Sequence, residues 1–207
     1  MKRICVLAVA TLTASSALAG GPVYVPPLEI PMAAPTKDWT GPYVGAQLGF
    51  ARGTANVATP VTGDFDGDLS GFLYGLHAGY LYDMGSLVLG GEIDYNLANI
   101  ALDGAPFAVG DASATALAHA KLRVGYDATS ALFYGTAGMA YMAVDPSFAA
   151  DTSGTGYFAG AGVEFNVTTD WTAGLEYLYH QFEDFGDGIG DPDITLQTIQ
   201  ARVSYHF

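Results

Sequence analysis

The stretch Ile199-Gln200-Ala201-Arg202-Val203-Ser204-Tyr205-His206-Phe207 alternates strictly between apolar and polar side chains. Successive side chains of a β-strand point to opposite faces, so one face here is apolar with an aromatic end and the other is polar and carries a cation. A soluble sandwich can contain such a strand. A barrel in lipid must close with one, because an unpaired strand edge cannot be left in hydrocarbon. Recurrence of the pattern decides between the two folds.

The same period-two alternation recurs in seven earlier segments, so we predict eight strands. The earlier segments are residues 43–51, 72–82, 87–97, 116–126, 131–141, 157–167 and 171–181, and the final strand is entered near Ile194. Each is close to the 9–11 residues that a tilted strand needs to cross a bilayer. No apolar run after residue 19 approaches the roughly 20 residues that a spanning helix needs.

The connections between these segments alternate in length. Residues 52–71, 98–115, 144–156 and 182–193 form long connections, and residues 83–86, 127–130 and 168–170 form short ones. Short turns at one rim and long loops at the other are typical of outer-membrane barrels. We therefore predict an all-β fold: an eight-stranded antiparallel up-and-down transmembrane β-barrel over residues 39–207. An even strand number places both termini on the short-turn, periplasmic side.

The first 38 residues are expected to lie outside the barrel. Lys2 and Arg3, the apolar run after them and the small-x-small sequence ending at Ala19 predict a secretory signal peptide over residues 1–19. Prolines 22, 26, 27, 31 and 35 predict an extended periplasmic linker over residues 20–38. The single cysteine, Cys5, lies in the signal peptide, so we expect no disulfide and no thiolate metal site in the mature chain.

The chain is strongly acidic, with 21 Asp and Glu against seven Lys and Arg and a formal net charge of −14. This balance argues against nucleic-acid binding, which needs basic surface to neutralise phosphates. Half of the residues are hydrophobic, which also argues against an acidic disordered chain.

The charged residues within the predicted strands share one face. They are Glu92, Asp94, Glu164 and Glu176 with Lys121, Arg123 and Arg202, and His77, His119 and His180 lie on the same face. The interior of an eight-stranded barrel is only wide enough for side chains to fill it. Buried charge is tolerated there when it is paired. We therefore predict an interior salt-bridge network formed by the seven charged residues, in place of an open pore.

Carboxylates beside histidines are also the components of acid–base catalysis. No Ser or Cys nucleophile accompanies these histidines in an evident constellation. His180, near the long-connection end of its strand, is the one candidate for a lipid-modifying site. Its position in the alternation points its side chain into the barrel. We predict that the protein is not an enzyme, with no catalytic residue and no cofactor.

The long connections are acidic. Asp64, Asp66 and Asp68 begin like a calcium-binding loop but lack the Gly and the distal Glu of an EF-hand in register. Solvated surface loops explain these acids without a ligand. Divalent cations that bridge the loops to anionic lipid headgroups are the alternative, and the three aspartates are its metal-ligand candidates.

Aromatic residues gather at the strand ends and predict two girdles at the membrane interfaces. The short-turn rim is expected to hold Trp39, Tyr43, Tyr80, Tyr82, Tyr126, Trp171, Tyr205 and Phe207, and the long-loop rim Tyr95, Tyr141, Tyr157 and Tyr179.

Three motifs resemble the opacity-type family of bacterial outer-membrane β-barrels, within the OmpA-like superfamily. They are DWTGPYVGAQLG at residues 38–49, LGGEIDY at 89–95 and GAGVEF at 160–165. The resemblance covers residues 39–207 and implies a location in the outer membrane of a Gram-negative cell. It also implies that the terminal strand, with Tyr205 and Phe207, is the signal read by the barrel assembly machinery. Members of the family include surface adhesins, porin-like proteins and haem-binding proteins.

These observations predict a monomer with a structural or surface-interaction role, either envelope integrity or adhesion through acidic extracellular loops. The expected partners are outer-membrane lipid, lipopolysaccharide, the assembly machinery and an extracellular ligand of the loops. A narrow porin or small-solute channel is the alternative function. An outer-membrane lipid enzyme and a haem-binding surface protein follow it.

Overall fold

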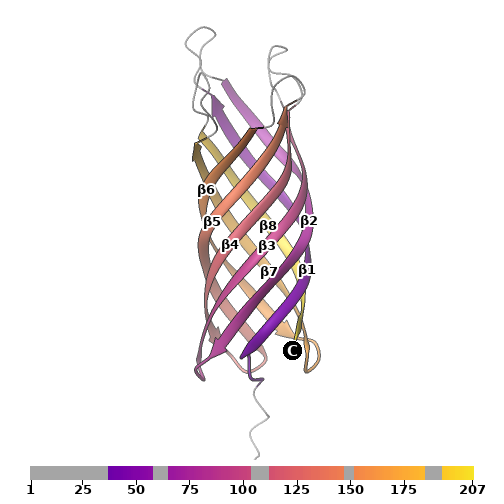
Figure 1. Cartoon of the computed structure of the whole chain (residues 1–207), viewed down its shortest axis with the longest axis vertical. Helices are drawn as coiled ribbons and strands as arrows, with labels where there is room; N and C mark the ends of the chain where they lie inside the picture. The colour runs from indigo at the N-terminus through magenta and orange to yellow at the C-terminus, as the bar shows by residue number, and fades with distance from the viewer. Residues whose placement is uncertain (1–36, 58–64, 104–111, 147–151, 185–192) are drawn as a thin grey trace, which may run out of the picture. The chain divides into compact units, whose positions relative to one another are not determined.

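The computed structural model describes residues 37–57, 65–103, 112–146, 152–184 and 193–207. They form one closed antiparallel barrel in which each strand pairs with the next and β8 returns to β1 (Figure 1). The strands are β1 (Gly41–Val57), β2 (Phe65–Asp83), β3 (Leu87–Asp103), β4 (Ala112–Asp127), β5 (Ala131–Pro146), β6 (Thr152–Asn166), β7 (Trp171–Asp184) and β8 (Asp193–His206). The predicted eight-stranded up-and-down barrel is confirmed.

Two predicted segments at the start of the chain are not described by the structure. The predicted signal peptide and all but the last two residues of the predicted linker precede the described residues. No helix within the described ranges is long and apolar enough to cross a membrane.

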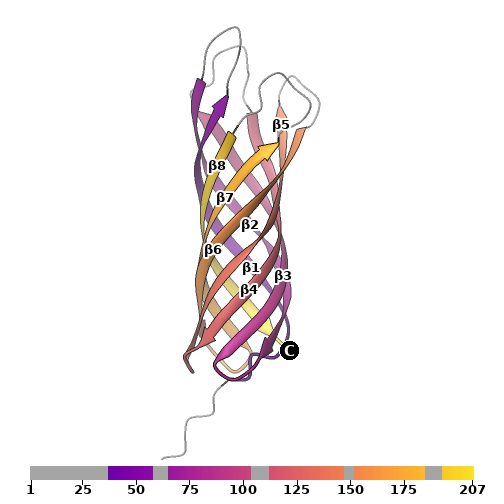
Figure 2. The same cartoon turned by 90° about the vertical axis from the view of Figure 1, so that its left-hand side faces the viewer.

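The strands are staggered, which tilts them against the barrel axis (Figure 2). The ladder of backbone partners that starts at Pro42 runs through Tyr80, Gly91, Leu122, Ala137, Ala159, Tyr179 and Gln197 and returns to β1 at Arg52. Arg52 is ten residues beyond Pro42 on the same strand. Strand number and stagger together set the width of a barrel, and eight strands leave an interior that side chains can fill.

The strands are longer than the sequence pattern indicated. They contain 14 to 19 residues, and the additional residues lie mainly at the long-connection end. β1 continues to Val57 and β2 begins at Phe65, so the predicted connection 52–71 is much shorter. Backbone pairing does not require an apolar outward face beyond the hydrocarbon. The alternation that marks a lipid-facing strand therefore ends before the hydrogen-bond ladder does.

Two of the short turns, at their predicted positions, use an aspartate to fix the backbone. Asp83 Oδ1 accepts the Gly85 N–H at 2.7 Å, and Asp127 Oδ1 accepts the Thr129 N–H at 2.8 Å. Gly85 has φ = +99° and Thr129 has φ = +71°. Glycine adopts this left-handed region without steric cost, whereas a β-branched residue does not.

The turn that contains Thr129 is therefore expected to gain stability from glycine. Thr129→Gly should raise the free energy of unfolding by about 1 kcal/mol, because it removes the Cβ strain of a left-handed residue. Urea denaturation of the refolded protein in detergent measures the change. Gly85→Thr is the matched control and should lower the free energy of unfolding; a destabilised Thr129→Gly would contradict the interpretation.

The inward and outward faces follow the predicted alternation. On β1, the outward Leu48 is 66% exposed and the inward Gln47 is 4% exposed. Most aromatic residues of the two predicted girdles point outward, but Trp39 and Tyr43 are wrongly placed there, since each is only 1% exposed and lies inside the barrel. Tyr43 shares the parity of Gln47, and Trp39 packs against the ring of His206 at 5.6 Å between centroids.

Candidate functional site

The lumen is filled by buried side chains in three layers. At the short-turn end these are Trp39, Tyr43, Leu81, Val88, Leu132 and Tyr134. The long-connection end is apolar and holds Ala51, Leu69, Leu73, Ile100, Ala114, Leu117, Ala140, Met142, Phe158, Leu178, Phe182 and Leu196. The charged residues lie between them. The charged part of the polar interior expected from the sequence thus lies in the middle layer.

Lys121 is the central cation of the charged layer. Its Nζ lies 2.6 Å from Glu176 Oε1, 2.8 Å from Asp94 Oδ2 and 3.1 Å from Glu92 Oε1. These four side chains come from β3, β4 and β7 and have no solvent exposure. One ammonium therefore ties three carboxylates across the lumen.

The two arginines complete the pairing. Arg202 Nη1 lies 2.7 Å from Glu176 Oε2, and Arg202 Nη2 also pairs with Glu92. Arg123 Nη1 lies 3.1 Å from Glu92 Oε2, and its Nη2 lies 3.2 Å from Glu164 Oε1. The structure thus brings all seven predicted charged residues into one network, with Glu92 in contact with all three cations.

Two tyrosines belong to the network and were not predicted in it. Tyr43 Oη donates to Glu92 Oε2 at 2.6 Å and accepts from Arg123 Nη1 at 2.8 Å. Tyr134 Oη donates to Glu176 Oε2 at 3.1 Å, and its ring lies 3.8 Å from the Arg123 guanidinium carbon. Both rings need nearby glycine, because a Cβ on Gly79 would lie 2.5 Å from Tyr43 Oη and a Cβ on Gly162 2.4 Å from Tyr134 Oη.

Removal of the Tyr43 hydroxyl tests its place in the network. Tyr43→Phe should lower the free energy of unfolding by about 1.5–3 kcal/mol, because the hydroxyl bonds to two charged groups that would remain buried. Equilibrium denaturation in detergent measures this. The exposed Tyr80 on β2 provides the control, and Tyr80→Phe should stay within about 0.5 kcal/mol of the parent protein. Equal effects of the two variants would contradict the assignment.

Two histidines extend the charged layer toward β8. His180 Nδ1 lies 3.1 Å from the Leu196 carbonyl, His180 Nε2 lies 2.8 Å from His119 Nε2, and His119 Nδ1 lies 2.7 Å from Asp94 Oδ1. These contacts connect Asp94 on β3 to the backbone of β8 through the two imidazoles.

A chain of polar side chains continues from Asp94 to β8. Asn96 Nδ2 donates to Asp94 Oδ1 at 2.6 Å, and Gln47 Nε2 donates to Asn96 Oδ1 at 2.7 Å. His77 Nδ1 lies 3.1 Å from Gln47 Oε1, and its Nε2 lies 2.9 Å from Ser204 Oγ. The inward parity of these residues was readable in the sequence, but their pairing depends on the stagger between strands.

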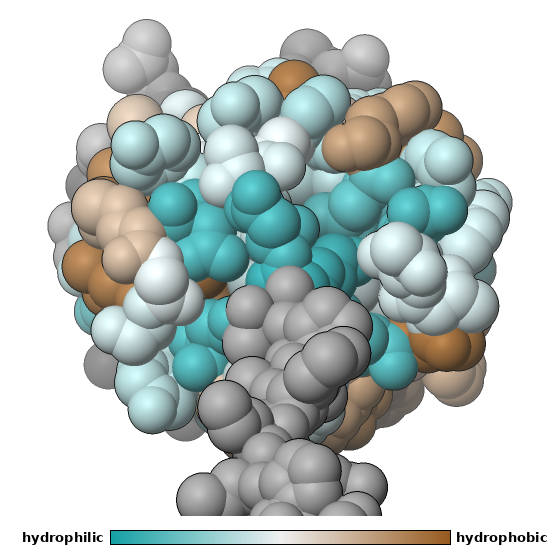
Figure 3. Space-filling view, turned by 90° about the horizontal axis from the view of Figure 1, so that it is seen from below, coloured by the Kyte–Doolittle hydropathy of each residue, from teal (hydrophilic) through white to brown (hydrophobic). Residues whose placement is uncertain are grey.

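The short-turn mouth is ringed by hydrophilic side chains (Figure 3). The Thr40 N–H donates to Asp38 Oδ1 at 2.8 Å and holds the pKa of that carboxyl below its usual range. The Lys37 ammonium lies 5.0 Å from the centre of the Trp39 ring. Partial burial lowers the pKa of Lys37, and the charges of Glu164 and Asp170 oppose this shift. The Trp39 N–H donates to Asp83 Oδ2 at 3.2 Å and the Asp83 N–H donates to Thr40 Oγ1 at 3.1 Å, so the segment that enters β1 is held against the end of β2.

The remaining predicted residues are not brought into a site. Asp64 and the side chain of Asp66 lie outside the description, and Asp68 is exposed on β2, so their role as cation ligands stays a prediction. Among the described residues no three His, Cys, Asp or Glu are grouped to hold a metal ion. The Tyr205 ring packs edge-on against Phe207 at 5.0 Å, and Phe207 is 72% exposed.

The arrangement of the lumen is that of a packed core. The side chains of the seven charged residues are at most 1% exposed, and His180, the one catalytic candidate, is fully buried. The outward surface, in contrast, carries large apolar residues at high exposure, with Leu122 and Phe72 at 72%. A polar interior inside an apolar exterior is the arrangement of a barrel that stands in lipid.

The family model for the outer membrane protein beta-barrel domain matches residues 5–207. The chain belongs to this family. It is therefore a β-barrel protein of the Gram-negative outer membrane, as the sequence predicted.

Individual relatives agree with this membership. The chain is 29% identical to the 31 kDa outer-membrane immunogenic protein of Brucella melitensis biotype 1, over the whole of both chains. OprG from Pseudomonas aeruginosa matches with a TM-score of 0.53 and 14% identity, covering 83% of this chain and 98% of that structure. Neisserial surface protein A matches with a TM-score of 0.51 and 18% identity, covering 81% and 98%. At these identities the two structures show a shared fold alone.

Proposed function

We propose that this outer-membrane barrel is a sealed, non-catalytic scaffold that acts through contacts of its long connections at the cell surface. The observation that carries the proposal is the filled lumen: buried aromatic, charged and apolar layers succeed one another along the barrel. A rigid barrel without a water path leaves the connections between the strands as the parts that can meet a partner. Adhesion or envelope integrity is then the role.

The orientation follows from the connections. Short turns of outer-membrane barrels face the periplasm and longer connections face outward. We place the turns after β2, β4 and β6 in the periplasm and the connections after β1, β3, β5 and β7 at the surface. The Brucella melitensis relative is an immunogenic protein by name, which supports exposure of this surface to a host. The protein is proposed to act as a monomer that the barrel assembly machinery inserts.

Epitope insertion tests this orientation and exposure. An epitope placed between Val57 and Phe65 should bind antibody on intact cells. The same epitope placed after Gly85, in a turn of the opposite rim, should bind only after the outer membrane is permeabilised. The reverse pattern would overturn the proposal. Gene deletion followed by adhesion and detergent-sensitivity assays then separates the adhesive role from the envelope role.

The alternatives lack a supporting observation in the described residues. All four histidines of the sequence are inward and at most 8% exposed, so the outer face offers no histidine ligand to haem. A porin would need a continuous water path through the three packed layers.

A further inference from the structure

Arg52 is the one cation on the outward surface of the described strands. It is exposed on β1 and forms no salt bridge with any described residue. The other strand cations, Lys121, Arg123 and Arg202, are buried in the lumen. On a chain with a net charge of −14, an exposed and unpaired guanidinium is a donor for an anion that comes from outside the protein.

Polar groups surround Arg52 near the long-connection end. Its register partners are Ser70 on β2 and Gln197 on β8. Gln197 Oε1 accepts the Tyr177 hydroxyl at 3.0 Å, so the amide N–H groups of Gln197 remain as donors. Arg52 follows Phe50 on the outer face, beyond the apolar band. This is the level at which lipid headgroups meet a barrel.

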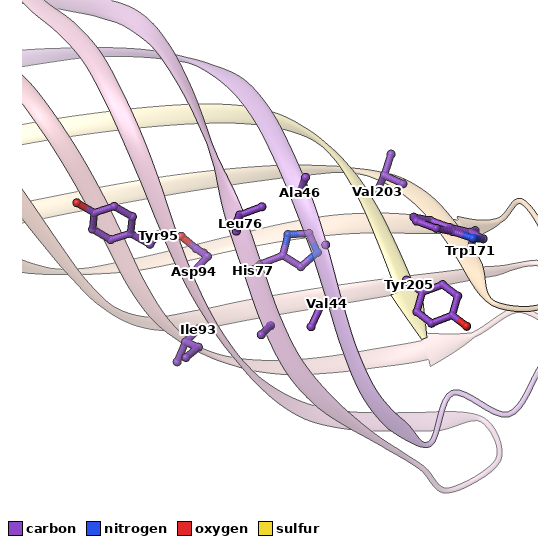
Figure 4. A pocket seen from close by; sticks show the side chains of 12 residues that line it. Val44, Ala46, Leu76, His77, Ile93, Asp94, Tyr95, Trp171, Val203 and Tyr205 are labelled. Carbon is purple, nitrogen blue, oxygen red and sulfur yellow. The ribbon is translucent and has the colours of Figure 1, made fainter. Parts of the chain in front are cut away.

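Further down, the same face of β1 enters an apolar groove of about 650 Å³ (Figure 4). Ala46 on β1 and Ala78 on β2 are small side chains between the larger Leu76, Ile93 and Tyr95. Their short side chains leave the hollow. The groove lies within the lipid-facing surface, so hydrocarbon covers it.

The groove continues toward Arg52. A second hollow of about 540 Å³ shares Ala46, Leu76 and Tyr95 with the first and extends to Leu48. Six residues separate Ala46 from Arg52, or about 20 Å along a strand at 3.3 Å per residue. In a strand tilted by about 40° this covers about 15 Å of depth, which is half of the roughly 30 Å hydrocarbon core. A lipid chain that starts at Arg52 and follows the tilt of β1 reaches the groove within one leaflet.

We propose that this surface binds one phosphorylated glycolipid of the lipid A type. A phosphate of the glycolipid pairs with Arg52, its sugar groups meet Gln197 and Ser70, and one acyl chain lies in the groove beside Ala46. The choice of an outer-leaflet lipid rests on the proposed orientation, in which the long connections face outward. The charge of Arg52 and the shape of the groove are separate features, so each can be removed alone.

Native mass spectrometry of the folded mature protein, titrated with bisphosphorylated lipid A in detergent, tests the site. Arg52→Gln should weaken binding about tenfold or more, because a charge-assisted contact is lost. Arg52→Lys should keep part of the affinity. Ala46→Phe, which fills the groove, should also weaken binding. Ala159→Phe is the matched control, since Ala159 is an exposed outward alanine on β6, and it should bind as the parent does.

Four results would overturn the proposal. The first is that Arg52→Gln binds lipid A as the parent does, and the second is that Ala159→Phe loses as much lipid A affinity as Ala46→Phe. The third is that phosphatidylglycerol binds as tightly as lipid A, with the same dependence on Arg52. The fourth is that the parent protein is a dimer and Ala46→Phe dissociates it, which would make the groove a contact between two copies. Heat-modifiable gel migration confirms that each variant is folded. Lipid binding in detergent does not depend on the orientation in cells, so a failure here is distinct from a failure of the epitope experiment.

Discussion

Arg202→Ala is expected to lower the free energy of unfolding by about 3–5 kcal/mol, because breaking a buried ion pair leaves its partner charged and uncompensated. Arg202, on β8, forms ion pairs with both Glu92 and Glu176, and its side chain is 1% exposed. Without it, Glu176 keeps Lys121 and Tyr134 but loses its arginine. Urea unfolding of the refolded barrel in detergent measures the change.

The control for this variant is another arginine of the same barrel. Arg52→Ala removes an exposed guanidinium that pairs with no described residue, so it should stay within about 0.5 kcal/mol of the parent protein. Arg202→Ala combined with Glu176→Gln should recover part of the loss, because the second change removes the uncompensated carboxylate. A near-neutral Arg202→Ala would refute the network as a source of stability.

Deletion of Phe207 is expected to reduce the folded protein in the outer membrane to a small fraction of the parent level. Phe207 is exposed, and apart from the edge contact with Tyr205 it contributes its N–H to the Pro42 carbonyl at 3.1 Å. An exposed ring with one aromatic contact contributes about 1 kcal/mol or less to a folded barrel. The defect should therefore lie in assembly. Quantitative blotting of the heat-modifiable form in membrane fractions measures it.

Two comparisons separate assembly from stability for this residue. Phe207→Tyr keeps an aromatic end and should assemble as the parent does. The deletion variant, refolded from urea into detergent, should unfold within about 1 kcal/mol of the parent. A large loss of unfolding free energy in the refolded deletion variant would instead make Phe207 a stability residue. The predicted assembly signal of Tyr205 and Phe207 would then be wrong.

Alternation along each strand was sufficient to predict the fold and the inward charges. A one-residue shift would have moved every side chain to the opposite face, so the alternation alone placed Glu92, Lys121 and Arg202 on the inward face. Parity also placed Tyr43 inward, but its position at a strand end favoured a membrane girdle. For Tyr43 at the rim, the alternation along the strand predicted the direction of the side chain correctly, whereas its location at the strand end did not.

The partners within the lumen were not predictable in this way. Lys121 meets Asp94, Glu92 and Glu176 because the stagger sets which levels of β3, β4 and β7 coincide, and no local pattern encodes it. Trp39 precedes the first strand, so no alternation assigned its direction. The sequence pattern did not predict the strand ends beyond the lipid, because backbone pairing there does not require alternating apolar side chains.

Planar-bilayer recording of the purified, refolded barrel tests the central claim most directly. The filled lumen predicts no steady open conductance, with the membrane current at the baseline of a protein-free bilayer. Flotation of the protein with liposomes, together with its heat-modifiable gel migration, would show that the barrel had inserted and was folded. Steady open conductance in the parent protein would contradict the sealed scaffold and favour the narrow porin.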